Sequence, residues 1–245
     1  MTMKLPSLNT PTYQLTLPSS GEKIGFRPFL VKEEKILLLA METDDNKQIA
    51  RALEQIVLNC TDDAVDVRTL PLFDLEYIFL QIRAKSAGET AEPTLFLTDE
   101  NGKEHEIKLK IPIVDIEVTK DPKHTNEIKL TEDIAVRMKY PTFGMSEEYA
   151  DANPDSSSIA FDMVVSCIDE IYQGEESWKC SELPREELEG FVETMSQEQF
   201  LALSEFFNTM PKLEKELEVP VGKKKHKVKL SGLQDFFGSP SVTLQ

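Results

Sequence analysis

The segment from Asp74 to Gly88 constrains the fold of this chain more than any other part of it. Its apolar and aromatic residues recur at helical spacing, which predicts a helix with one face packed into a core. We expect this helix to span residues 69–85, with Thr69 as its N-cap and Pro71 in the first turn, where proline is tolerated. Cationic residues and a glycine follow at its end, where both are favoured. Nothing in the segment is catalytic, so it predicts architecture rather than chemistry.

The other helices are predicted from apolar spacing and from residues that suit helix ends. Pro184 opens the sequence Pro-Arg-Glu-Glu, a favourable first turn because proline has no donor to lose and acids suit the positive helix end. Ser196 opens Ser-Gln-Glu-Gln, which is close to a capping box. The further helices that we expect are 33–41, 47–59, 159–172, 184–195, 196–208 and 232–237.

Short antiparallel hairpins are predicted around these helices. Asn101-Gly102, between two alternating segments, is the strongest cue, because both residues accept positive φ. A Pro-Ser-Ser-Gly turn at 18–21 indicates another hairpin near the start of the sequence. The expected strands are 12–17, 23–29, 94–98, 105–111, 113–119, 127–130, 135–140, 216–219 and 226–230, with a polar loop at 146–158.

We therefore expect an α+β fold, in which a helical layer is combined with short antiparallel β-hairpins. The 245 residues suffice for one large domain or two small ones. The predicted parts are an N-terminal α+β part at 1–145, a C-terminal helical part with a closing hairpin at 146–238, and a loose tail at 239–245. Residues 102–109 (GKEHEIKL) and 223–230 (KKKHKVKL) resemble each other, so either chance or a helix-plus-hairpin unit used twice explains this similarity.

Charge and hydropathy restrict the partners of the chain. The net charge of −17 argues against nucleic-acid or anionic-membrane binding, since phosphate contacts need clustered Lys and Arg. The apolar runs are too short to span a bilayer, and the first residues lack a signal-peptide apolar region, so we expect a soluble protein that stays where it is made. One basic cluster contains Lys223, Lys224 and Lys225. It is either a solvated hairpin turn or a patch that binds an acidic partner.

The cysteines and histidines give no candidate for catalysis. Cys60, Cys167 and Cys180 form no Cys-x-x-Cys pair, so we expect neither a disulfide framework nor a zinc ribbon, and a reducing compartment fits. Cys60 and Cys167 lie in apolar helical patterns and are expected to be small core residues. The histidines, His105, His124 and His226, are expected to be isolated surface residues.

Sequence motifs for catalysis are also missing from the chain. It contains no HExxH, GxSxG, GxxxxGK[ST] or GxGxxG. The acidic clusters lie at expected turns and helix starts, where carboxylates have structural reasons to be. We therefore predict that the chain is not an enzyme, with no catalytic residue to name.

Two aromatic features remain as candidate contacts for a protein partner. Leu233, Phe236 and Phe237 lie in a short C-terminal segment, and Trp178 lies in an expected loop. Each of these features either folds onto its own domain or serves as an anchor at an interface, because buried aromatic residues dominate both kinds of contact. The sequence leaves both alternatives open.

Several sequence blocks together resemble the T4-type phage baseplate hub subunit and hub assembly family. The blocks keep their order from about residue 24 to residue 237, and none is an enzymatic motif. They are FRPF at 26–29 with VKEEK at 31–35, the segment 74–88, YPT at 140–142, LALSEFFNTMPKL at 201–213 and LSGLQDFF at 230–237. The resemblance implies a role in assembling the central hub of the contractile-tail baseplate inside the infected cell.

From this resemblance we expect a non-enzymatic chaperone or assembly factor that binds other phage baseplate hub proteins. It would act in the host cell cytoplasm during assembly, while its presence in the virion and its oligomeric state stay open. One alternative is a permanent structural subunit of the hub, repeated around the tail axis. Another is a hub-associated hydrolase, for which the sequence nominates no catalytic acid.

The resemblance also implies a Cys-x-x-Cys turn in the C-terminal hairpin, of a kind that binds metal. The corresponding residues here, 219–222, are Val-Pro-Val-Gly. We therefore expect no metal and no cofactor, and the turn lacks whatever folding energy a metal would supply.

Overall fold

A computed structural model describes residues 8–43, 45–98, 103–148, 157–221 and 224–237. The α+β class predicted from the sequence is confirmed. Contacts divide the chain into two compact units, unit 1 with residues 1–118 and 213–245, and unit 2 with residues 119–212. The boundary expected between residues 145 and 146 lies inside unit 2, and the closing hairpin belongs to unit 1. The tail predicted at 239–245 lies outside the described residues.

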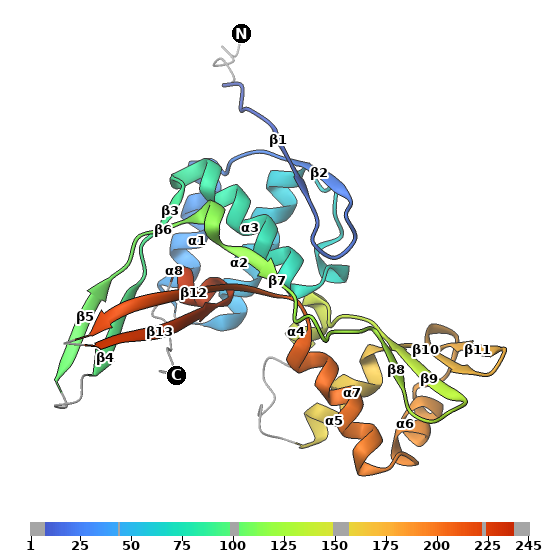
Figure 1. The fold of residues 1–245 in the computed structure, drawn as a ribbon. Helices are drawn as coiled ribbons and strands as arrows, with labels where there is room; N and C mark the ends of the chain where they lie inside the picture. Colours follow the sequence, from blue (N-terminus) through green and yellow to red (C-terminus); the bar gives the residue numbers. More distant parts are fainter. Residues whose placement is uncertain (1–7, 44, 99–102, 149–156, 222–223, 238–245) are drawn as a thin grey trace, which may run out of the picture. The chain divides into compact units, whose positions relative to one another are not determined.

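Unit 1 is built around neighbouring helices, which Figure 1 draws in blue to green. They are α1 (Val31–Met41), α2 (Asn46–Thr61) and α3 (Leu72–Ala87), and the short α8 (Gly232–Phe237), drawn in red, lies against α3. One-turn 3₁₀ helices occur at Val67–Thr69 and Ile113–Asp115. The apolar face of α3 is buried, as the sequence predicts, through Phe73, Leu75, Ile78, Phe79, Leu80 and Ile82.

The predicted start of α3 is wrong by one turn. Thr69 ends a 3₁₀ turn, and Pro71 is the N-cap of α3. The Pro71 carbonyl accepts hydrogen bonds from the N–H groups of Asp74 and Leu75, at 3.0 and 3.2 Å. Proline suits this place because it needs no donor there and its φ is fixed. Gly88, at φ +111°, ends the helix in a conformation that favours glycine.

Three strand pairs of unit 1 are hairpins, as expected, and a further pair, between residues 90–91 and 111–112, was not predicted. The pairs are β1 (Tyr13–Thr16) with β2 (Lys23–Phe26), β3 (Thr90–Ala91) with β6 (Ile111–Pro112), β4 (Thr94–Thr98) with β5 (Glu104–Lys108), and β12 (Lys212–Val221) with β13 (Lys224–Ser231). β7 (Glu117–Thr119) adds to β12, so only the end of the strand expected at 113–119 is a strand. The two hairpins with similar sequences place their histidines alike, with His105 opposite Leu97 and His226 opposite Val219.

Unit 2 combines one sheet with helices. The strand order is β11 (Glu176–Lys179), β10 (Ile168–Gln173), β9 (Ile134–Met138) and β8 (Glu127–Lys129), all antiparallel. The helices are α4 (Phe143–Glu148), α5 (Ser157–Cys167), α6 (Arg185–Glu193) and α7 (Gln197–Thr209), with a 3₁₀ turn at Cys180–Glu182. The capping box at Ser196 is confirmed. The core includes Val136, Met138, Val164, Cys167, Ile168, Leu203 and Phe206.

The helix predicted at 159–172 is wrong in its second half, and the loop at 146–158 is partly wrong. The helix α5 stops at Cys167, and Ile168 opens β10, which pairs with β9 and β11. Apolar residues at 168 and 171 fit a helical period as well as a buried strand, so the periodicity alone does not separate the two. Part of the expected loop belongs to α4, and residues 149–156 lie outside the described part of the chain.

The chain enters and leaves unit 2 through neighbouring strands. β7 leads into unit 2 and β12 leads out of it, and the two strands are hydrogen-bonded neighbours in one sheet. Unit 2 is therefore an insertion into unit 1 with its two ends adjacent. Among the described residues no helix is long and apolar enough to cross a membrane.

Candidate functional site

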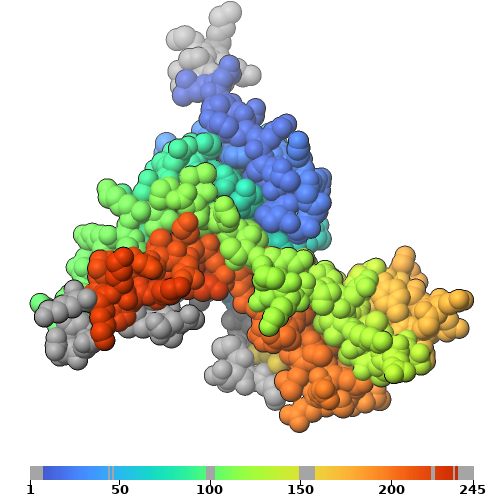
Figure 2. Space-filling view, in the orientation of Figure 1, coloured from blue at the N-terminus to red at the C-terminus, as the bar shows by residue number. Residues whose placement is uncertain are grey.

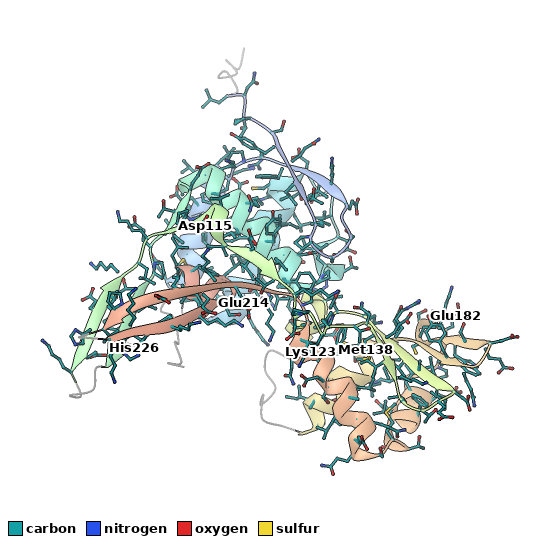
Figure 3. The ribbon with its side chains drawn as sticks, viewed as in Figure 1. Asp115, Lys123, Met138, Glu182, Glu214 and His226 are labelled. Atoms are coloured by element: carbon teal, nitrogen blue, oxygen red, sulfur yellow. The ribbon has the colours of Figure 1, made fainter. Side chains whose placement is uncertain are left out.

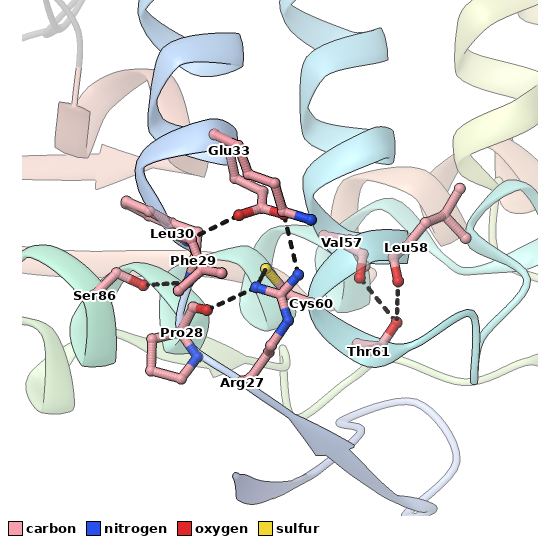
Figure 4. Close-up of polar contacts among 11 residues, drawn as sticks. Arg27, Pro28, Phe29, Leu30, Glu33, Val57, Leu58, Cys60, Thr61 and Ser86 are labelled. Carbon is pink, nitrogen blue, oxygen red and sulfur yellow. Dashed lines mark hydrogen bonds and ion pairs between the residues drawn. The ribbon is translucent and has the colours of Figure 1, made fainter. Parts of the chain in front are cut away.

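A buried ion pair joins the loop after β2 to the first turn of α1 (Figure 4). The Glu33 carboxylate is fully buried and lies 3.0 Å from the Arg27 guanidinium, and it also accepts the Leu30 N–H at 2.8 Å. Burial opposes its ionisation, but the bonds from Arg27 and Leu30 outweigh this and lower the pKa of Glu33. Two sequence blocks, FRPF and VKEEK, are thereby bound to each other, so their polar residues have a structural role.

The same loop is bound to the end of α3. The N–H of Phe29 donates to Ser86 Oγ at 2.8 Å (Figure 4). Ser86 Oγ in turn donates to the Ile82 carbonyl within the helix. The Cys60 thiol lies 3.8 Å from the Arg27 guanidinium, yet burial raises its pKa to about 11. A thiol with such a pKa is protonated at neutral pH and is a poor nucleophile.

The buried carboxyl group of Asp74 and the half-buried one of Glu76, near the start of α3, bind segments that are distant in the sequence. Asp74 accepts hydrogen bonds from the N–H of Ser19, at 3.1 Å, and from its hydroxyl, which holds the turn of the β1–β2 hairpin. Glu76 accepts the Leu233 N–H at 3.3 Å, at the start of α8. Burial raises the pKa of both groups, that of Glu76 to about 7. The segment from Asp74 to Gly88 is therefore a scaffold to which three other segments of unit 1 are bound.

The lysines of the C-terminal hairpin face carboxylates of the paired strand. Residues at alternate positions of β12 and β13 point away from the core, and there Lys225, Lys227 and Lys229 lie 3.3, 2.8 and 2.8 Å from Glu218, Glu216 and Glu214. This hairpin is the orange-red surface in Figure 2, and Figure 3 labels Glu214 and His226 on its two strands. Because these lysines are paired with carboxylates of the same hairpin, the segment is better explained as a solvated hairpin than as a patch that binds an acidic partner. Lys224 is exposed, and Lys223 lies outside the described residues.

The candidate anchors in α8 belong to the interior of unit 1. Phe236 is fully buried and Leu233 nearly so, and α8 contacts α3. The side chain of Phe237 lies outside the described residues. These positions favour the alternative in which the segment folds onto its own domain. A partner protein could reach Phe236 only if α8 moved away from the rest of unit 1.

Trp178 lies in the edge strand β11 and not in the loop that the sequence suggests. It pairs with Ile171, so both side chains lie on the face of the sheet that carries the core of unit 2. Its exposed fraction is 37%, and all four residues of β11 are exposed. Among the candidate aromatic contacts with described side chains, Trp178 is the one that a partner can reach directly.

The expectation that the histidines lie on the surface is wrong for His124. It is buried in unit 2, where its ring nitrogens lie 3.0 Å from Thr209 Oγ1 and 3.1 Å from Tyr140 Oη. Its ring packs 5.0 Å from that of Phe206. Burial, with the nearby charge of Lys120, lowers the pKa of His124. Both hydrogen bonds and ring contacts fix the ring, which makes it part of the core.

Two features of the described residues concern metal binding and thiol chemistry. They contain no group of three or more His, Cys, Asp or Glu side chains that could hold a metal. Cys167 and Cys180 are buried like Cys60, and burial raises their pKa values to about 12 and about 11. The prediction that Cys60 and Cys167 are core residues is confirmed.

An exposed apolar face on α1 was not singled out by the sequence analysis. Val31, Leu38 and Leu39 are each more than half exposed, although they lie in a regular helix. The sequence could have indicated this face, because apolar residues occur all around the helix. Such a helix needs packing contacts on more than one side.

Comparison with known proteins assigns the family. The model of the family described as "T4 bacteriophage base plate protein" matches residues 10–238. The chain belongs to this family, and the match associates it with the baseplate of the phage tail. No match is found among curated proteins, and none among solved structures.

Proposed function

We propose that this baseplate protein is a non-enzymatic assembly factor, which helps to build the central hub of the baseplate by binding other hub proteins. The observation that carries the proposal is the family match, which extends over residues 10–238. The protein would act in the cytoplasm of the host cell, where tails are assembled. Its role would be that of a chaperone, present during assembly and released from the finished hub.

The roles of the ionisable groups support a binding function rather than catalysis. The carboxyl groups of Glu33, Asp74 and Glu76 in unit 1 each accept a hydrogen bond from a backbone N–H, either of a distant segment or at a helix start. A catalytic acid or base needs instead to reach a substrate in an open site. The buried thiols are protonated at neutral pH, which leaves them without nucleophilic activation.

For the surface that binds a partner we propose the β11 edge with Trp178. An exposed aromatic side chain on an edge strand can insert into a pocket while the strand offers backbone groups for pairing. Lys224 and Lys225 remain secondary candidates, since Lys225 already faces Glu218. Leu233 and Phe236 support the fold, so removal of 233–237 is expected to lower the stability of unit 1 as well as any binding.

The test is assembly of hubs in extracts of infected cells that lack this chain. Adding the purified protein should restore hub complexes, measured by sedimentation, and a Trp178→Ala variant should restore them less well. The matched control is Leu201→Ala, which truncates another exposed apolar residue of unit 2. Hubs that form normally without the protein would contradict the proposal, and a fully active Trp178→Ala variant would remove the β11 surface from it.

A further inference from the structure

The exposed face of α1 combines apolar and charged side chains in one stripe. At about 100° per residue, Val31, Lys35, Leu38, Leu39 and Glu42 lie on the same side of the helix. Val31, Leu38 and Leu39 are 79, 56 and 52% exposed. The opposite side of the helix carries the buried Glu33 and Ala40.

The helix is held firmly from behind, so its exposed face is a defined surface. Glu33 is bound to Arg27 and caps the helix start through the Leu30 N–H. α1 also packs along α2 through its buried side. An apolar stripe on a well-anchored helix is typical of a contact with another helix.

The charges of the stripe suit a second copy of the same stripe. Lys35 and Glu42 flank Leu38 and Leu39 on either side, and neither makes an ion pair within the described part of the chain. In an antiparallel pair with a two-fold axis between Leu38 and Leu39, Lys35 of each copy lies level with Glu42 of the other. The leucines then meet at the centre, and antiparallel helix dipoles add a small attraction.

We propose that α1 binds α1 of a second copy in this antiparallel arrangement, so that the protein forms a two-fold dimer. The helix is about 16 Å long, which is short beside a standard protein interface. The dimer is therefore weak and depends on protein concentration. The proposal does not depend on the role in hub assembly, and it assigns an oligomeric state that the sequence left open.

Sedimentation velocity of the full-length protein tests the proposal, over roughly two orders of magnitude in concentration around the micromolar range. We expect a monomer–dimer equilibrium, which Leu38→Glu abolishes without changing thermal unfolding. The matched control Leu201→Glu, at an equally exposed site on α7, should leave the equilibrium unchanged. A protein that stays monomeric throughout, or a dimer that survives Leu38→Glu, would overturn the proposal.

Charge reversal tests the register of the two helices. Lys35→Glu and Glu42→Lys should each raise the dimer dissociation constant about tenfold or more, because each places like charges together twice. The double variant restores both pairs with reversed sign, so its dissociation constant should return close to that of the wild type. A double variant weaker than either single one would contradict the antiparallel arrangement.

Discussion

Unit 1 and unit 2 enclose polar groups in different ways. In unit 1 three carboxyl groups, those of Glu33, Asp74 and Glu76, bind backbone N–H groups at the starts of helices or in a turn. In unit 2 the imidazole of His124 lies among aromatic rings, and the buried carboxylate of Glu170 is paired with Arg137. Unit 1 thus encloses carboxyl groups that accept hydrogen bonds from backbone N–H groups, whereas the buried polar groups of unit 2 are bonded to other side chains. The two units should respond differently to mutation and in opposite directions to pH.

The largest effect is expected from Phe206→Ala in unit 2. Phe206 is 2% exposed and contacts His124, Tyr140 and Phe207, so truncation leaves a cavity and should cost about 4 kcal/mol of unfolding free energy. Trp178 is the single tryptophan of the chain and reports on unit 2 by its fluorescence. Leu201→Ala, on the exposed side of α7, should change stability by less than about 0.5 kcal/mol. Equal effects of the two variants would refute the assigned core.

Glu33→Ala should have the next largest effect, and that effect should be confined to unit 1. It leaves the Arg27 guanidinium partly buried without its partner and removes the helix cap, which should cost about 3 kcal/mol. Hydrogen exchange followed by mass spectrometry can measure this cost separately in α1–α2 and in unit 2. The control Lys32→Ala removes a largely exposed cation from the same carboxylate, at 3.2 Å, and should have a much smaller effect. Equal loss of protection in both units would show that they unfold as one.

Glu76 makes unit 1 sensitive to rising pH. Burial raises its pKa from 4.5 to about 7, so between these values the folded state holds a proton that the unfolded state has released. The stability of unit 1 should therefore be highest at the acidic end of this window and fall as pH rises through it. Glu76→Gln keeps an acceptor for the Leu233 N–H and should remove this dependence. An unchanged pH profile in the variant would show that another group causes it.

His124 should give unit 2 the opposite response. Burial lowers its pKa below 6.5, so below that pH the unfolded state binds a proton more readily than the folded state does. The stability of unit 2, followed by Trp178 fluorescence, should fall as pH decreases from 6.5 through the lowered folded pKa. This effect should be smaller than that of Glu76, and His124→Gln should flatten it. A stability of unit 2 that rises on mild acidification would contradict the buried, neutral imidazole.

Features that depend on neighbouring residues were predictable from the sequence. The Ser196 capping box, the hairpins of unit 1 and the buried face of α3 each follow from a few adjacent residues. Local rules fail where a distant segment decides the structure. Ile168 continues the helical spacing of α5, but pairing with Met138 makes it the start of a strand.

The candidate sites were harder to predict for the same reason. His124 is buried because Thr209, 85 positions later in the chain, supplies one of its hydrogen bonds. Lys225, Lys227 and Lys229 look like part of a basic patch only until the glutamates of β12 are placed beside them. By contrast, the exposed face of α1 can be read from its own sequence, since apolar residues surround that helix.

The most direct test of the assembly role is a quantitative search for this protein in two samples, purified finished phage particles and infected-cell lysate. Mass spectrometry with labelled standard peptides gives the copy number in each. Our account predicts that the protein is abundant in lysate and absent from finished particles. A fixed copy number in the particles would contradict the role of an assembly factor and would make the protein a permanent subunit of the baseplate.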